Sequence, residues 1–322
     1  MPLPIEDYAL LGDTGTCALV GRDGSVDWLC LPRFDSPACF AALLGSPKHG
    51  RWLISPSEAA GDVASTWRYV DDTFVLETTH ETETGTVRVT DLMPIDDGRA
   101  DVVRIVRGVS GTVEMQHEWV VRFRYGKVRP WVTRRKDEEG REVISAIAGP
   151  DMLVLRGTRL PKATDGKHTD TFEVSEGDEH VFSTTWFKSH RPIPPMLDLE
   201  QRRRDTIAVS QDWAAGCRYD GPYDGAVRRS LLVLRMLTHG GTGGIVAAPT
   251  TSLPEDFGGT RNWDYRFCWL RDASLTLEAL LSAGYHGETR LWRDWLLRAI
   301  AGDPQDVQIM YAVDGARDLP ER

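Results

Sequence analysis

The pattern of apolar residues changes once along this chain, close to Pro192, and this change limits the folds that the chain can adopt. Before Pro192, short runs rich in valine, isoleucine, threonine and aromatic residues alternate with turn-forming glycine, proline and aspartate. Such runs at short spacing are typical of an antiparallel β-sandwich. After Pro192, apolar residues recur every three or four positions, as they do on one face of a helix. The sequence therefore predicts a β domain followed by an α domain.

Eight runs in the first part of the chain are expected to form strands. They cover residues 73–79, 85–92, 102–109, 112–125, 143–148, 152–155, 171–174 and 180–187. Turn signals separate them, and one of these signals is the serine-glycine pair at 110–111. The arginine-aspartate-glycine sequence at 22–24 lies between two further apolar runs and predicts a hairpin near the start of the chain.

A proline-rich connector and several helices are expected to follow the strands. The connector at 191–195 reads RPIPP. It is stiff because proline fixes φ and removes backbone donors. A polar helix is expected over 197–209, and an amphipathic helix over 223–239. Two further apolar stripes with helical spacing come after them. We therefore expect a sandwich domain over 1–193, a helical linker over 194–221 and a helical domain over 222–322.

Composition and charge exclude several classes of protein. Hydrophobic residues make up 41% and charged residues 27% of the chain, which is typical of a globular protein. The formal net charge of −10 argues against nucleic acid as a partner. No apolar stretch is long enough to span a membrane, and the start MPLPIEDYAL does not resemble a secretory signal, so we expect a cytoplasmic protein. The spacing of the five cysteines and eight histidines predicts neither a disulfide framework nor a metal site.

Chemically versatile side chains gather at the end of a long loop over residues 240–268. A loop of this length in a compact domain is usually functional or disordered. The candidate residues lie within ten positions: Trp263, Asp264, Tyr265, Arg266, Trp269, Arg271 and Asp272. An arginine donor, an aspartate acceptor and an aromatic wall suit a polyhydroxyl ligand, because each sugar hydroxyl both donates and accepts hydrogen bonds.

Two structural interpretations compete with a sugar site. Asp272 stands near the start of a predicted helix, where a carboxylate can cap exposed N–H groups. Alternatively, the whole cluster is a buried ion pair packed among aromatic residues of a core. The residues alone leave these interpretations open.

Four separated segments point to a known family. They read IEDYALLGDTGTCALVGRDGSVDWLCLPRFDSPACFAALLG at 5–45, GTVRVTDLMP at 85–94, GIVAAPTTSLPEDFGGTRNWDYRFCWLRDAS at 244–274 and QIMYAVDGARDLPE at 308–321. These segments resemble glycoside hydrolases of family 15, which include glucoamylases, glucodextranases and bacterial trehalases. The opening segment is similar to trehalase-like members in particular. The resemblance implies a β-sandwich, a helical linker and an (α/α)6 barrel, in the order that the residue pattern predicts.

The resemblance also implies roles for individual residues. Trp269, Arg271 and Asp272 match a tryptophan-x-arginine-aspartate pattern that lines the subsite for the non-reducing glucose. Tyr265 matches an aromatic residue close to the catalytic base. Supporting positions of this wall fall on Trp263, Asp264 and Arg266. The implied reaction needs no cofactor, because inversion at a glycosidic carbon uses two carboxylates and a water.

The two catalytic glutamates of the family lie in later barrel loops than the loops that this chain resembles. Both are therefore expected beyond Arg322, and Glu255, Glu278 and Glu288 are not assigned to catalysis. The chain offers three or four of the twelve helices of a closed barrel, so we expect an incomplete barrel. Each large apolar side chain left without a partner forgoes about 1.5–3 kcal/mol. The helical part is therefore expected to be marginally stable or aggregation-prone by itself.

The leading functional hypothesis is the N-terminal portion of an inverting α-glucoside hydrolase, inactive as this chain alone. Its substrate would be trehalose or another glucose-containing oligosaccharide, with trehalase-like activity ahead of glucoamylase-like activity because of the opening segment. The alternative is a non-catalytic carbohydrate-binding or scaffold protein. A third hypothesis is one half of a split enzyme, completed by a separate chain that supplies the rest of the barrel.

Overall fold

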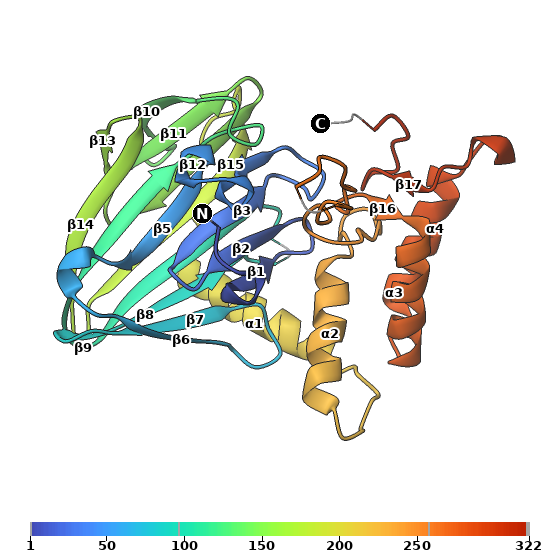
Figure 1. Cartoon of the computed structure of the whole chain (residues 1–322), viewed down its shortest axis with the longest axis horizontal. Helices are drawn as coiled ribbons and strands as arrows, with labels where there is room; N and C mark the ends of the chain where they lie inside the picture. Colours follow the sequence, from blue (N-terminus) through green and yellow to red (C-terminus); the bar gives the residue numbers. More distant parts are fainter. Residues whose placement is uncertain (1, 96, 257, 320–322) are drawn as a thin grey trace. The chain divides into compact units, whose positions relative to one another are not determined.

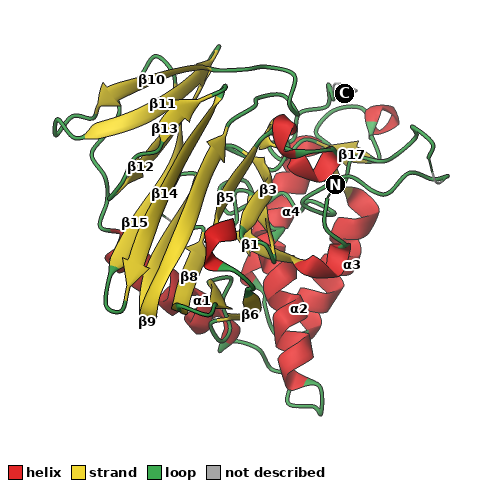
Figure 2. Ribbon diagram, turned by 60° about the vertical axis from the view of Figure 1, so that its left-hand side comes forward, coloured by secondary structure: helices red, strands yellow, loops and turns green. Residues whose placement is uncertain are grey.

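The computed structural model describes residues 2–95, 97–256 and 258–319, and Figures 1 and 2 show its helices and strands. The chain forms two compact units. The first contains Met1–Gly12, Ala18–Leu31 and Pro37–Ala208, and the second contains Asp13–Cys17, Pro32–Ser36 and Val209–Arg322. Two short segments from the N-terminal part therefore pack with the C-terminal residues. In the described part of the chain, no helix is long and apolar enough to cross a membrane.

The first unit is built from strands, as predicted. Their bounds are β1 (Tyr8–Gly12), β2 (Cys17–Gly21), β3 (Ser25–Cys30), β4 (Ala38–Phe40), β5 (Arg51–Pro56), β6 (Ala64–Tyr69), β7 (Leu76–Glu81), β8 (Gly85–Leu92), β9 (Asp101–Val120), β10 (Trp131–Lys136), β11 (Glu142–Ala148), β12 (Asp151–Gly157), β13 (Lys162–Thr164), β14 (Lys167–Ser175) and β15 (Glu179–Lys188). Short 3₁₀ turns lie at η1 (Ile5–Asp7), η2 (Ala42–Leu44), η3 (Pro47–His49) and η4 (Glu58–Ala60). The hairpin predicted at 22–24 joins β2 to β3.

The strands of the first unit form two layers, and strand β9 belongs to both of them (Figure 2). Its first half pairs with β8 and β15, and its second half pairs with β5 and β14, all in antiparallel register. The sequence predicted two strands here, separated by a turn at 110–111, and that prediction was wrong. The chain does not reverse. Gly111, with φ of +62°, instead marks the place where β9 passes from one layer to the other, and a Cβ on Gly108 would collide with the carbonyl oxygen of Ser175.

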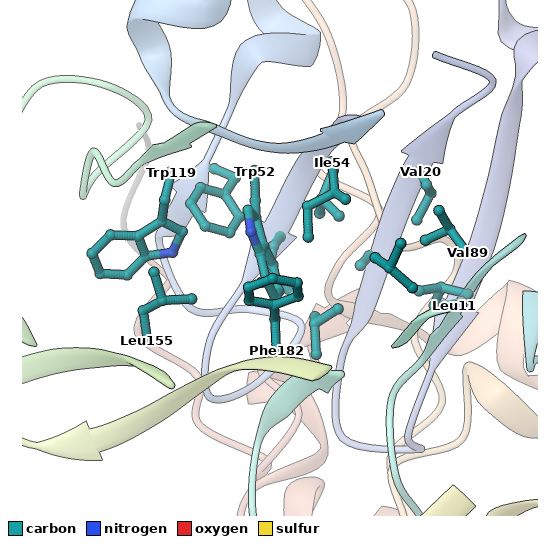
Figure 3. Close-up of a cluster of buried hydrophobic side chains, with 14 of the residues drawn as sticks. Leu11, Val20, Trp52, Ile54, Val89, Trp119, Leu155 and Phe182 are labelled. Atoms are coloured by element: carbon teal, nitrogen blue, oxygen red, sulfur yellow. The ribbon is translucent and has the colours of Figure 1, made fainter. Parts of the chain in front are cut away.

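The two layers enclose one apolar core (Figure 3). Trp52 from β5 and Phe182 from β15 face each other across it, and both are fully buried. Alternate residues of each strand point inward, since successive side chains of a strand lie on opposite faces. Arg104 on β9 is also fully buried, and it donates two hydrogen bonds to the carboxylate of Asp91, at 2.8 and 3.1 Å. The charged pair is thus matched in geometry, which offsets the cost of its burial.

Helix α1 (Leu199–Ala214) confirms the helix predicted from residue 197. Its first residues pack on a face of the sandwich, where Leu199 joins a buried cluster with Val103. Arg202 anchors this contact with two hydrogen bonds of 2.9 Å to Asp101. The division between the two units falls after Ala208, inside α1.

The second unit contains the predicted amphipathic helices (Figure 1). They are α2 (Asp224–Met236), α3 (Leu270–Ser282) and α4 (Gly287–Ala299), accompanied by the short strands β16 (Cys268–Trp269) and β17 (Met310–Tyr311) and the turn η5 (Pro304–Asp306). Leu231 of α2 and Leu280 of α3 form one buried cluster with Tyr285. The ring of Tyr285 stacks on that of Trp213 with 4.0 Å between centroids. These contacts hold α3, whose first turn carries the candidate site.

Candidate sugar-binding site

The predicted loop over 240–268 folds back on itself through main-chain hydrogen bonds. The N–H of Ala248 donates to the carbonyl of Tyr265 at 2.8 Å, and the N–H of Ser252 donates to the carbonyl of Trp263 at 2.8 Å. An isolated antiparallel bridge joins Thr251 to Asp264 between these two bonds. The loop therefore forms an irregular hairpin that presents residues 263–267 immediately before β16.

Three aromatic rings of the candidate cluster meet in this hairpin. The ring of Trp269 lies edge-to-face against that of Trp263, with centroids 5.7 Å apart, and against that of Tyr265, with centroids 5.9 Å apart. Edge-to-face pairs are the favoured arrangement of aromatic rings. Trp269 is 8% exposed, whereas Trp263 is 36% exposed. The cluster thus has a buried centre and an outer ring surface that solvent can reach.

Asp264 and Arg266 form a fork beside these rings. Arg266 donates from Nε to one carboxylate oxygen of Asp264 at 3.0 Å and from Nη2 to the other at 2.6 Å. Arg266 is only 2% exposed. The main-chain carbonyl of Asp264 accepts a 2.9 Å hydrogen bond from Nε1 of Trp269. The two residues therefore form an ion pair in which the arginine is buried and the aspartate side chain is 26% exposed.

Arg271 and Asp272 lie in the first turn of α3 and are much more exposed. Nη2 of Arg271 is 3.0 Å from an oxygen of Asp272, and the two side chains are 71% and 31% exposed. Exposed ion pairs contribute at most about 1 kcal/mol to stability. The pair therefore does little for the fold, and both groups can exchange their mutual bond for bonds to a ligand.

The strand pair β16–β17 places this turn. Trp269 pairs with Met310 and Cys268 pairs with Tyr311, and both Cys268 and Tyr311 are fully buried. Burial raises the pKa of the Cys268 thiol, which favours its protonated form. Among the residues that the structure describes, no group of three or more histidines, cysteines or carboxylates could hold a metal ion.

Sequence reasoning did not single out three charged residues that lie close to this strand pair. They are Arg33, Asp35 and Asp314. Arg33 and Asp314 are 281 positions apart, yet Nη1 of Arg33 is 2.7 Å from a carboxylate oxygen of Asp314. The one signal in the sequence was that both residues fall within segments that carry the family resemblance.

Comparisons with known proteins agree with the fold. Residues 1–209 match the family described as trehalase-like, N-terminal, and residues 221–322 match glycosyl hydrolases family 15. The trehalase of Mycolicibacterium smegmatis is 32% identical over 343 residues, covering 99% of this chain and 51% of that protein. The trehalase of Thermoplasma volcanium is 33% identical over 332 residues, with the same two coverages. The chain thus spans about half the length of the curated relatives it matches.

A solved structure shows the same fold. A bacterial glucoamylase complexed with acarbose superposes with a TM-score of 0.68 at 11% identity, covering 98% of this chain and 53% of that chain. The trehalase-like N-terminal family matches more than half of this chain, so the chain belongs to that family. It is thus a trehalase-like protein, and its residues 221–322 match glycosyl hydrolases family 15.

Proposed function

We propose that this chain supplies the N-terminal half and one wall of the sugar-binding pocket of an inverting α-glucoside hydrolase, with trehalose as the preferred substrate. The observation that carries the proposal is the exposed Arg271–Asp272 pair beside the aromatic cluster of Trp263, Tyr265 and Trp269. The trehalase relatives support trehalose as the first substrate to test.

The chemistry of these side chains suits a glucose unit. Arg271 offers only donors and Asp272 offers only acceptors, so together they can satisfy neighbouring sugar hydroxyls. An exposed aromatic face, such as that of Trp263, suits the C–H face of a pyranose ring. The roles of Tyr265 beside a catalytic base and of Asp264 and Arg266 as supports are part of this proposal.

Catalysis needs two further carboxylates, and two of the glutamates that the sequence analysis left unassigned, Glu255 and Glu288, have other partners. Glu255 accepts a 3.0 Å hydrogen bond from Nε1 of Trp263. Glu288 accepts one of 2.5 Å from Nε1 of Trp213. Inverting hydrolases require a general acid and a general base on opposite faces of the sugar. We therefore place both catalytic glutamates beyond Arg322 and propose that the 322-residue chain is inactive alone.

The helices support the proposal of an incomplete barrel. An open apolar groove of about 350 Å³ runs between α2 and α3, lined by Val227, Leu231 and Leu234 on one side and by Ala279 and Ala283 on the other. On α3 and α4, large apolar side chains are exposed, including Leu275 at 62% and Leu297 at 60%. Further helices of the same barrel, in the half of the relatives' length that this chain does not match, would cover these surfaces.

Glucose release and binding test the proposal. The 322-residue chain should bind trehalose weakly and release no glucose from it, while a protein extended through the remaining barrel should release glucose from trehalose faster than from maltose or isomaltose. Release of glucose by the 322-residue chain would contradict the placement of the glutamates. Binding without hydrolysis in the extended protein would favour a carbohydrate-binding protein, and activity regained only on mixing with a separate C-terminal chain would favour a split enzyme.

A further inference from the structure

Residues 32–36 lie between β3 and β4 in the sequence, but they pack as part of the second unit. The segment is a closed turn, because the N–H of Ser36 donates to the carbonyl of Arg33 at 3.1 Å and the N–H of Arg33 donates to Oγ of Ser36 at 3.2 Å. Phe34 is buried, and its N–H donates to the carbonyl of Gly15 at 3.1 Å. These bonds give the turn a defined shape.

One residue of this turn holds the β16 side of the candidate site. The carbonyl of Ser36 accepts a 2.9 Å hydrogen bond from Nη1 of Arg266. Arg266 also donates two hydrogen bonds to the carboxylate of Asp264. The main-chain carbonyl of Asp264 in turn accepts a hydrogen bond from the indole N–H of Trp269. Because Arg266 is buried, loss of a partner for its N–H groups would be costly. Ser36 is therefore linked to Trp269 through three successive hydrogen-bonded contacts, by way of Arg266 and Asp264.

The preceding residue holds the β17 side of the same strand pair. Oδ2 of Asp35 accepts a 3.1 Å hydrogen bond from the buried N–H of Val313, which follows β17. Arg33 donates to the same carboxylate from Nε at 3.0 Å and reaches Asp314 with Nη1 at 2.7 Å. The side chain of Asp35 is 5% exposed, so few of these bonds could be replaced by bonds to water.

We infer that Asp35 is a positioning residue for the sugar-binding wall. Two adjacent residues of one turn accept hydrogen bonds from both sides of the β16–β17 pair. Ser36 accepts one from Arg266, which precedes β16, and Asp35 accepts one from Val313, which follows β17. Trp269 ends β16 and precedes α3. These hydrogen bonds therefore fix both the ring of Trp269 and the first turn of α3, which presents Arg271. That Asp35 affects sugar binding rests on the proposed function. The effect of Asp35 on Trp269 can be measured without a sugar.

Fluorine NMR of the 322-residue chain labelled with 5-fluorotryptophan tests the inference, with the Trp269 signal assigned from Trp269→Phe. Asp35→Ala should shift or broaden the Trp269 signal. Asp35→Asn keeps an acceptor for the N–H of Val313 and should restore most of the original signal. Asp294→Ala removes an exposed carboxylate from α4 and serves as the matched control, with no change expected. If Asp35→Ala does not fold, Arg33→Gln, at a partly exposed position, provides the same readout with a smaller shift.

The outcomes separate the inference from the proposed function. The dissociation constant for trehalose should rise about tenfold in Asp35→Ala, which corresponds to the loss of one buried hydrogen bond. An unchanged Trp269 signal in the folded variant overturns the inference. A Trp269 signal that moves, in a wild-type chain that does not bind trehalose, supports the positioning role and counts against the proposed function.

Discussion

Nε1 of Trp269 donates a 2.9 Å hydrogen bond to the carbonyl of Asp264, five residues earlier. This bond turns the polar edge of the indole into the protein and away from solvent. Trp269 is therefore the buried centre of the aromatic cluster, and the outer ring surface belongs mainly to Trp263 and Tyr265, both more exposed than Trp269.

Trp269→Phe should weaken the second unit by about 1 kcal/mol, because the ring contacts remain while the carbonyl of Asp264 loses its partner. Urea unfolding followed by circular dichroism measures the loss. Trp263→Phe is a suitable control, since its indole bond to Glu255 is exposed and should matter less. Equal losses of stability in the two variants would mean that the buried hydrogen bond of Trp269 stabilises the unit no more than the exposed hydrogen bond of Trp263 does.

Asp272→Ala should abolish trehalose binding and change the free energy of unfolding by less than about 1 kcal/mol, because its bond to Arg271 is exposed. An NMR titration and a urea melt of the same sample give both values. The chain offers a matched control in α4, where Arg293 and Asp294 form a second exposed pair of neighbours at 2.8 Å. Asp294→Ala should leave binding intact. A binding loss shared by both variants would remove the case for a site at Asp272.

The order of β and α parts could be predicted because strands and helices impose different spacing on apolar residues. The strands that the sequence missed lack that spacing. β6 and β10 each pair with one strand only, and β10 reads WVTRRK, so an edge position lets polar residues replace apolar ones. β5 is buried but ends at Pro56, and proline weakens a strand prediction.

The candidate site was predictable only where it is contiguous in sequence. Trp263 to Asp272 lie within ten positions, so their chemistry could be seen together. The bond between Ser36 and Arg266 joins residues 230 positions apart, and no periodicity or spacing signals such a contact. The same limit applies to Gly111, where a turn signal turned out to mark a strand that crosses between layers.

The sandwich should lose stability as pH falls below 6.5. Burial and the charge of Arg104 lower the pKa of His117 from 6.5 to about 3, and the same causes lower that of His80 to about 4. Between pH 6.5 and these values the unfolded chain binds protons that the folded chain excludes, so stability is full above pH 6.5 and is lost as pH decreases through this window. Each histidine contributes at most about 1.4 kcal/mol per pH unit.

His117→Gln should make this pH dependence shallower while keeping an acceptor for Nε1 of Trp52, which donates to His117 at 2.9 Å. Urea midpoints at pH 7 and pH 5 give the difference. The control is His190→Gln, at an exposed position, which should keep the wild-type slope. A slope that His117→Gln does not change would show that the acid sensitivity comes from other groups.

The two units should unfold separately, and the helical unit should unfold first. The sandwich encloses a large apolar core, whereas α3 and α4 leave Leu275 and Leu297 exposed. Differential scanning calorimetry should therefore show a weak transition at lower temperature and a sharp one above it. Leu297→Gln should reduce aggregation without lowering the first transition, because its side chain already contacts water. Leu280→Gln, at a fully buried position, should abolish that transition. One sharp transition that includes both units would mean that the helices are stable without further barrel partners.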